Sequence, residues 1–197
     1  MKEVNFRAEP LVTVADLNAM PDDGNRYETI NGELFVSKAP GITHQLVFGN
    51  LFRMLSSYLV KRPIGKIIGT PGLVLSHNDA VIPDLVFIRT ERLAQVVSGE
   101  RLVGAPELVI EILSPGNENK RRDRTVKRQL YGRFGVKEYW VVDPKKRSID
   151  VYVLKGRALG LGSSFGETED LSSAVLPGFR CPIDSVFNLG LPLRTAN

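Results

Sequence analysis

The chain has 197 residues, of which 43% are hydrophobic and 24% charged, as in a soluble globular protein with one sizeable core. No apolar run approaches the roughly 20 residues that a membrane span needs, and the single cysteine, Cys181, excludes an internal disulfide framework and a cysteine-based zinc site. We therefore expect a cytoplasmic protein without a membrane segment, and the net charge of +4 slightly favours an anionic partner.

The first third of the chain predicts two helices and a hairpin. Thr13 is suited to cap a short helix over residues 14–20. The dipeptide Asn31-Gly32 is a strong two-residue hairpin signal between strands over 27–30 and 33–38. A long helix is expected over 43–61, because its apolar residues recur at three- and four-residue spacing and form one stripe.

Short strands predominate in the rest of the chain. We expect strands over 66–69, 73–75, 83–88, 107–113, 137–142 and 148–154. A helical turn over 91–97 and a helix over 121–134 separate some of them, whereas the Gly/Ser-rich segment 156–170 predicts a loop before a strand near Ala174. No linker interrupts this order, so the sequence predicts one α/β domain with a central mixed β-sheet flanked by helices.

One carboxylate stands inside an apolar strand. Glu111 interrupts the apolar segment 108–113, where an ionised group is costly unless it is paired, hydrogen-bonded or bound to a metal. Asp84 opens a second apolar strand directly after Pro83. If the two strands are neighbours, the carboxylates converge and can hold Mg²⁺ or Mn²⁺. The alternatives are that Glu111 pairs with a core arginine or lies exposed at a sheet edge.

The helix that follows contributes a cation to the same region. Within the helix predicted over 121–134, Lys127 shares a stripe with Val126, Leu130 and Phe134, which should pack on the sheet. The ammonium group could point at the two carboxylates and position a water nucleophile. Alternatively, the lysine stem covers apolar surface while its amine reaches solvent.

Basic residues concentrate around this helix, with Asp123 as the one acid among them. The run contains Lys120, Arg121, Arg122, Arg124, Lys127, Arg128 and Arg133. Such a run is typical of a solvated helix face, but it is also typical of a surface that contacts phosphates.

An ordered set of motifs resembles the Uma2 family of the PD-(D/E)xK nuclease superfamily. The resemblance covers about residues 10–190 of a single domain over 1–197. Its motifs are Tyr27-Glu28-xx-Asn31-Gly32-Glu33-Leu34, His44, Pro83-Asp84-Leu85-Val86, the segment 104–115 around Glu111, Asp123-xxx-Lys127-xxx-Tyr131 and the segment 135–144. The resemblance implies a restriction-endonuclease-like fold with a central mixed sheet.

The resemblance also assigns roles to residues. Asp84 and Glu111 match the two metal-binding acids of the superfamily, and Glu33 matches an extra acid often supplied by the N-terminal region. The usual lysine lies two residues after the second acid, where this chain has Leu113. Lys127 is the natural substitute, because it can reach the same space from the next helix.

Further residues are assigned supporting and binding roles. His44 is expected to be structural, although a phosphate contact is the alternative, and Asp123 and Tyr131 are expected to orient Lys127. Tyr139 and Trp140 are expected in the core. The residues expected to contact nucleic-acid phosphates are Lys120, Arg121, Arg122, Arg124 and Arg128.

The resemblance implies a Mg²⁺- or Mn²⁺-dependent endonuclease that hydrolyses phosphodiester bonds in DNA. Because cutting two strands needs two sites, it also implies a homodimer. A module that keeps the fold and binds nucleic acid with weak or no catalysis is the alternative, supported by Leu113. A third possibility is a metal-dependent hydrolase of a small phosphate ester.

Overall fold

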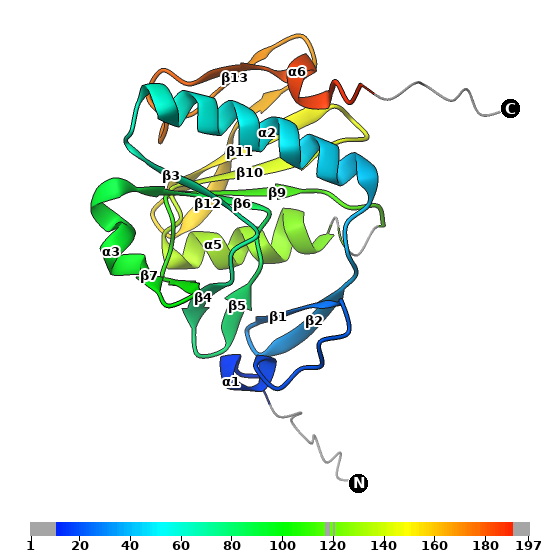
Figure 1. Ribbon diagram of the computed structural model, residues 1–197, viewed down its shortest axis with the longest axis vertical. Helices are drawn as coiled ribbons and strands as arrows, with labels where there is room; N and C mark the ends of the chain where they lie inside the picture. The colour runs from blue at the N-terminus through cyan, green and yellow to red at the C-terminus, as the bar shows by residue number, and fades with distance from the viewer. Residues whose placement is uncertain (1–10, 117–118, 120, 191–197) are drawn as a thin grey trace, which may run out of the picture.

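The computed structural model describes residues 11–116, 119 and 121–190. A six-stranded mixed sheet forms the upper body in Figure 1, with strand order β12-β11-β10-β9-β6-β3. In that order the strands are Ala158–Phe165, Ser148–Lys155, Glu138–Asp143, Leu108–Ile112, Leu85–Arg89 and Gly65–Gly69. The pair β9–β10 is parallel and the other pairs are antiparallel, so the predicted central mixed sheet is confirmed.

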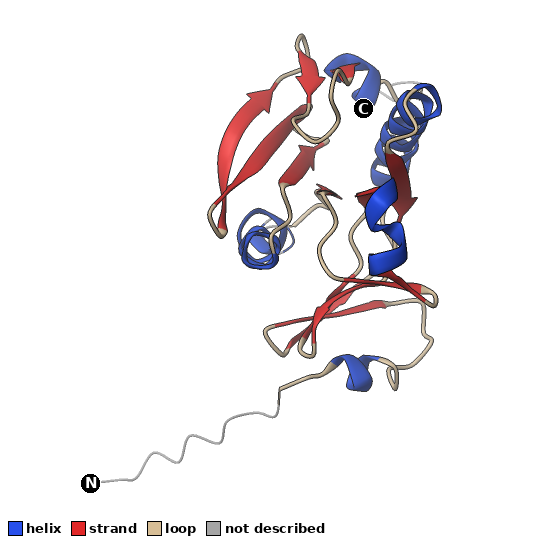
Figure 2. Ribbon diagram, turned by 90° about the vertical axis from the view of Figure 1, so that its left-hand side faces the viewer, coloured by secondary structure: helices blue, strands red, loops and turns tan. Residues whose placement is uncertain are grey.

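Helices cover both faces of this sheet (Figures 1 and 2). Helix α2 (Ile42–Lys61) buries the predicted stripe of Val47, Leu51, Leu55 and Leu59 against alternate residues of β9 and β10, including Trp140. On the other face, α5 (Arg128–Phe134) packs with Val109, Leu113 and Tyr139. Fully burying one such aliphatic side chain stabilises the fold by about 1.5–3 kcal/mol. Since side chains alternate along a strand, Glu111 shares the face that α5 covers.

A second sheet lies below the first in Figure 1 and was not foreseen from the sequence. Its order is β2-β1-β5-β4-β8-β7. The strands are Glu33–Ser37, Arg26–Ile30, Asp79–Val81, Leu73–Ser76, Arg101–Val103 and Val97–Ser98. The hairpin of β1 and β2 turns at Asn31 and Gly32, both with positive φ, as the sequence predicts.

Short elements complete the fold. These are α1 (Val14–Leu17), η1 (Thr90–Arg92), α3 (Leu93–Val96), β13 (Asp170–Ser172), β14 (Arg180–Pro182) and α6 (Ile183–Phe187). Thr13 caps α1 with a reciprocal capping box to Asp16, as expected for its position. Among the described residues, no helix is long and apolar enough to cross a membrane.

One expectation for the C-terminal part is wrong. The predicted loop over 156–170 contains β12, which pairs with β11 through a bulge between Val151 and Tyr152. Gly132 of α5 lets the helix approach β12 closely: a Cβ added at Gly132 would lie 3.0 Å from the Leu159 nitrogen. The strand expected near Ala174 is present as β13, which ends two residues earlier, at Ser172.

Candidate active site

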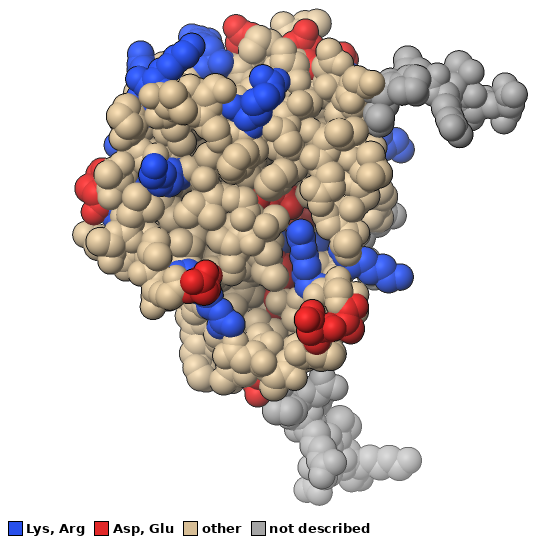
Figure 3. Space-filling view, in the orientation of Figure 1, with Lys and Arg blue, Asp and Glu red and all other residues tan. Residues whose placement is uncertain are grey.

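A pocket of about 360 Å³ opens where the two sheets meet. Four carboxylates from four different segments line it: Glu28, Asp84, Glu111 and Asp123. The space-filling view shows acidic side chains at the floor of this hollow and basic side chains at its rim (Figure 3). All four acids are buried, which is unusual for ionisable side chains and makes the pocket a candidate functional site.

The strand register places Asp84 beside Glu111. Leu85 pairs with Ile110 in the antiparallel ladder of β6 and β9, so the next position brings Asp84 opposite Glu111. Directly opposite residues point to the same face, with Cβ atoms about 4.5–5.5 Å apart. Two donors hold the Asp84 carboxylate: the Ile112 backbone N–H lies 2.8 Å from Oδ2, and His44 Nε2 lies 3.1 Å from the same oxygen.

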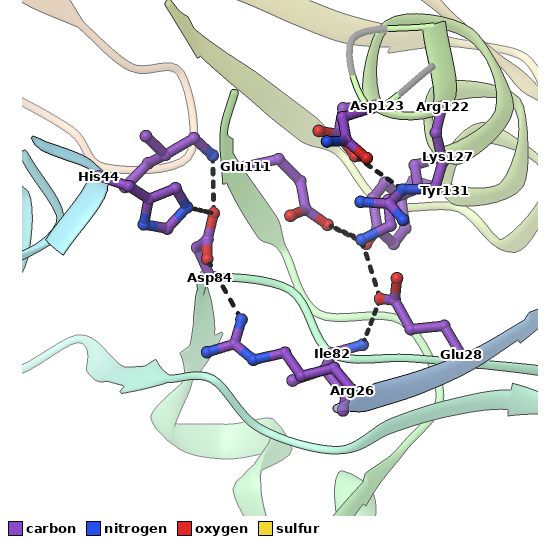
Figure 4. Close-up of polar contacts among 12 residues, drawn as sticks. Arg26, Glu28, His44, Ile82, Asp84, Glu111, Arg122, Asp123, Lys127 and Tyr131 are labelled. Carbon is purple, nitrogen blue, oxygen red and sulfur yellow. Dashed lines mark hydrogen bonds and ion pairs between the residues drawn. The ribbon is translucent and has the colours of Figure 1, made fainter. Parts of the chain in front are cut away.

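Lys127 reaches the carboxylates from an unusually wide helical turn. The predicted helix over 121–134 begins as a π-helix over Arg122–Lys127, and such turns are frequent at functional sites. Both Asp123 and Lys127 are buried on its inner side. The Lys127 Nζ atom donates to Glu111 Oε1 and to Glu28 Oε1, each at 2.9 Å (Figure 4). Lys127 therefore points into the pocket and does not snorkel to solvent.

Tyr131, one turn beyond Lys127, contacts the acid rather than the lysine. Its buried hydroxyl donates to Glu111 Oε1 at 2.8 Å, so one oxygen of Glu111 receives both donors. The buried Tyr139 hydroxyl donates to the Asp123 backbone carbonyl at 2.9 Å. This bond fixes the π-helix to the sheet.

Glu28 takes the place in the pocket that the resemblance assigned to Glu33. Glu33 is exposed at the start of β2 and does not line the pocket. Glu28 is buried on β1, where the Ile82 backbone N–H donates to Oε1 at 2.7 Å. The sequence carries a signal for this: Arg26 and Glu28 alternate with Tyr27 on one strand, so both charges point to the same face.

The charges in the pocket influence one another strongly. Burial raises the pKa of Glu111 to about 8, and Lys127 opposes this while the three other acids reinforce it. Burial likewise raises the pKa of Asp123. Burial alone would lower the pKa of Lys127, but its carboxylate neighbours outweigh this and raise it, so the amine stays protonated. Among the described side chains that are buried in the pocket, Lys127 is thus the one lysine or arginine beside four acids, while Arg26, Lys38 and Arg122 line it from less buried positions.

The donor set suits a hard divalent cation. Within the described ranges, the second carboxylate oxygens of Glu28 and Glu111 accept no hydrogen bond, and Asp84 Oδ1 meets only Arg26 Nη1 at 3.9 Å. No three His, Cys, Asp or Glu side chains converge as a metal cluster in that part of the chain. Mg²⁺ is commonly held by one or two carboxylates and keeps several waters. Asp84 and Glu111 fit this requirement.

The basic run is only partly available to an outside ligand. Arg124 is held by Asp150 at 2.6 Å and Asp143 at 3.1 Å. Arg128 donates to the backbone carbonyls of Arg124 and Leu159 and lies over the Tyr152 ring. The expectation that both contact phosphates therefore conflicts with their internal bonds. Arg121 is exposed, Arg122 lines the pocket, and Lys120 lies outside the described residues.

The fold is a restriction-endonuclease-like α/β fold, with a mixed sheet between helices and a pocket of buried acids at its edge. It is similar to the crystal structure of "a putative nuclease belonging to DUF820 from Anabaena variabilis ATCC 29413", with a TM-score of 0.72 and 15% sequence identity over 91% of this chain and 99% of that one. No curated protein matches the sequence. The model of the Uma2 family, described as "Putative restriction endonuclease", matches residues 14–184. The chain belongs to the Uma2 family.

Proposed function

We propose that the protein is an endonuclease that hydrolyses phosphodiester bonds of DNA with Mg²⁺ or Mn²⁺ at the pocket of Glu28, Asp84, Glu111 and Lys127. The observation that carries the proposal is the bond from Lys127 Nζ to Glu111 Oε1 at 2.9 Å. Lys127 thus supplies, from the next helix, the ammonium group that the superfamily pattern would place at the position of Leu113. The Uma2 description supports a nuclease and hence a nucleic-acid substrate.

Each residue has a distinct task in this proposal. Asp84 and Glu111 would hold the cation, which would supply Lewis-acid stabilisation of phosphate charge and a more acidic water when bound. The Lys127 ammonium donates a hydrogen bond to the attacking water and offsets charge that develops on the phosphate. Glu28 holds Lys127 from the other side at 2.9 Å.

The remaining polar groups orient this set. Tyr131 and the Ile112 N–H each fix one oxygen of a carboxylate, which leaves the other oxygen for the cation. Three basic side chains, Arg26, Lys38 and Arg122, line the pocket and are placed to contact the substrate phosphate. Arg26 is the nearest to Asp84, at 3.9 Å.

A second candidate is a DNA-binding module without cleavage. The observation that favours it is that Lys127 Nζ already bonds two carboxylates, and that Leu113 is buried in the apolar cluster on the same face. In this case the four acids and Lys127 form a structural network rather than a catalytic one.

Nicking of supercoiled plasmid in Mg²⁺ or Mn²⁺ separates the two candidates. We expect cleavage by the wild type, and none above background by Glu111→Gln or Lys127→Met. The pair Glu28→Gln and Glu33→Gln is a matched control, because only Glu28 lines the pocket: the first should lose activity and the second should keep it. Equal nicking by the wild type and Glu111→Gln, or no nicking by any variant at high enzyme concentration, refutes the nuclease.

The expected homodimer is also a proposal. Two protomers, each with one pocket, would cut the two strands of a duplex in one encounter. Sedimentation velocity of the protein with and without duplex DNA tests it. A monomer in both conditions that still makes double-strand breaks refutes it.

A further inference from the structure

A second basic surface lies away from the acidic pocket, in a shallow groove between α2 and the C-terminal segment. The groove has a volume of about 360 Å³. Its polar lining is Arg53, Ser57 and Lys61 from α2, and Arg180 and Ser185 from the segment of β14 and α6. We call it the α2 groove. Figure 3 shows Lys and Arg side chains gathered over the C-terminal half of α2, on the same face as the hollow with acidic side chains.

Three features indicate that the α2 groove binds an anion. Arg53, Lys61 and Arg180 are exposed, and none forms an ion pair with another described residue. No carboxylate lines the groove, although Asp184 precedes Ser185 nearby on α6. Hydroxyl groups lie between the cations and can donate hydrogen bonds to phosphate oxygens.

The helix dipole explains only one of these cations. Lys61 lies in the last turn of α2, where positive charge is favourable in any helix. Arg53 lies in the middle of the same helix and Arg180 on a separate strand, so neither gains from the helix terminus. Chain segments more than 100 residues apart thus place like charges around one groove, which favours an anionic ligand there.

Helix α2 links the groove to the acidic pocket with a defined spacing. His44, near its start, bonds Asp84 in the pocket. At about 1.5 Å per residue, Arg53 and Lys61 lie about 14 and 26 Å further along the helix axis. Phosphates on one DNA strand advance about 3.4 Å per base pair, so these lengths correspond to about four and eight base pairs.

We propose that the α2 groove is a second contact for the DNA backbone, which holds phosphates about four to eight base pairs from the phosphate in the acidic pocket. The proposal rests on the proposed function in naming DNA as the ligand. It replaces Arg124 and Arg128, which are bonded internally, as the source of sequence-independent affinity. Contacts of this kind position the duplex without reading its bases.

The test measures binding without cleavage. Fluorescence anisotropy in EDTA gives the Kd of duplexes of about 24 base pairs and of hairpins with stems of about six base pairs, over about 50–200 mM salt. The variant Arg53→Gln/Lys61→Gln/Arg180→Gln removes the three charges and keeps hydrophilic stems. The control Lys146→Gln/Lys155→Gln/Arg157→Gln changes the net charge equally at exposed positions outside the groove.

For the long duplex, we expect the groove variant to bind at least about tenfold more weakly than the control at about 100 mM salt, with the slope of log K against log salt reduced by about two to three. The short hairpin should lose less affinity than the long duplex, because a stem of about six base pairs reaches Arg53 but not Lys61, which lies about eight base pairs from the pocket. Equal affinities and slopes of the two variants for the long duplex overturn the proposal. An equal loss of affinity for the short hairpin and for the long duplex also overturns it. Inorganic phosphate that displaces DNA more strongly than chloride of the same ionic strength overturns it as well, because that result indicates a small-anion site.

A second measurement holds even if the triple variant unfolds. A photo-crosslinking residue at Ser57, inside the groove, should crosslink to the long duplex, whereas the same residue at exposed Ala158 should not. Absence of crosslinks at Ser57 overturns the proposal. Groove-dependent DNA binding in EDTA without nicking in Mg²⁺ would refute the nuclease and leave the groove assignment intact. Nicking in Mg²⁺ with unchanged DNA affinity of the groove variant would support the nuclease and refute the groove assignment.

Discussion

Replacement of Lys127 by methionine tests the network in the pocket most directly. Lys127 is 2% exposed and its ammonium is shared by Glu28 and Glu111. Methionine keeps the length and apolar stem but removes the charge, which leaves two buried carboxylates without their common partner. Breaking a buried pair in this way typically costs about 3–5 kcal/mol of unfolding free energy. Lys137→Met is the matched control, because Lys137 is exposed and lies 3.7 Å from Glu107, and such a pair contributes about 0–1 kcal/mol.

The cost should depend on pH with a definite sign. Burial raises the pKa of Glu111 to about 8 from a model-compound value of 4.5, so the folded state binds more protons than the unfolded chain between these values. Unfolding free energy therefore falls as pH rises through this window. Lys127 lowers the pKa of Glu111, and its removal raises that pKa and widens the window. Below about pH 8 both proteins lose stability in parallel, so the penalty of Lys127→Met should be larger at about pH 9.5 than at about pH 7, by about 1.4 kcal/mol per pH unit above pH 8 at most.

Urea unfolding of the metal-free proteins at both pH values provides the measurement. Lys127→Met should destabilise the protein more than Lys137→Met does, and by more at the higher pH. The double variant Glu111→Gln/Lys127→Met should recover part of the loss, because glutamine carries no charge to compensate. If Lys127→Met cost less than about 1 kcal/mol at about pH 9.5, as an exposed pair would, the lysine would not be held between buried carboxylates.

Two further predictions concern the scaffold outside the pocket. Burial alone would raise the pKa of Glu107, but Arg92 at 2.6 Å and a backbone N–H outweigh this and lower the pKa. Glu107→Gln should therefore lose about 1–3 kcal/mol of unfolding free energy at neutral pH. Thermal melts should show that this loss fades as pH falls below about 4.5, where the carboxyl group takes up its proton. Gly132→Ala should cost about 1–3 kcal/mol of unfolding free energy in urea, because the added Cβ would lie 3.0 Å from the Leu159 nitrogen. Gly160→Ala is the control, since a Cβ at Gly160 meets nothing within 4 Å. Equal stability of the two alanine variants would contradict this packing.

Local patterns were sufficient to predict the central sheet and its helices. The stripe of α2, the apolar run around Glu111 and the Asn31-Gly32 turn each report conformation through residues close in the chain. The second sheet was missed because its strands β7 and β8 span two and three residues, too short to show alternation. The strand β12 was missed because half of its residues are Gly or Ser, which have low β-propensity. Pairing with β11 stabilises this strand.

For the site, the sequence indicated which strands carry charge but not which charges meet. Asp84 and Glu111 were recognisable as acids in apolar strands, whereas the choice between Glu28 and Glu33 depends on the face of β1 and on the way the second sheet docks. The basic run could not be sorted by composition, since Arg124 is committed to Asp143 and Asp150 by pairing across the fold. Only tertiary structure distinguishes a free cation from a paired one.

In the proposed function the catalytic lysine comes from the helix and not from the strand, which has a consequence for control of the site. A lysine at position 113 would be fixed by the ladder of β9, whereas Lys127 depends on how the π-helix docks on the sheet. Tyr139 anchors that helix through the Asp123 carbonyl, and Tyr131 meets the same Glu111 oxygen as Lys127. Tyr139→Phe should therefore lower kcat for DNA cleavage without a matching rise in KM, since it loosens the turn that aims Lys127 and leaves Asp84 and Glu111 in place. A change confined to KM would show that the turn aims the substrate rather than the lysine.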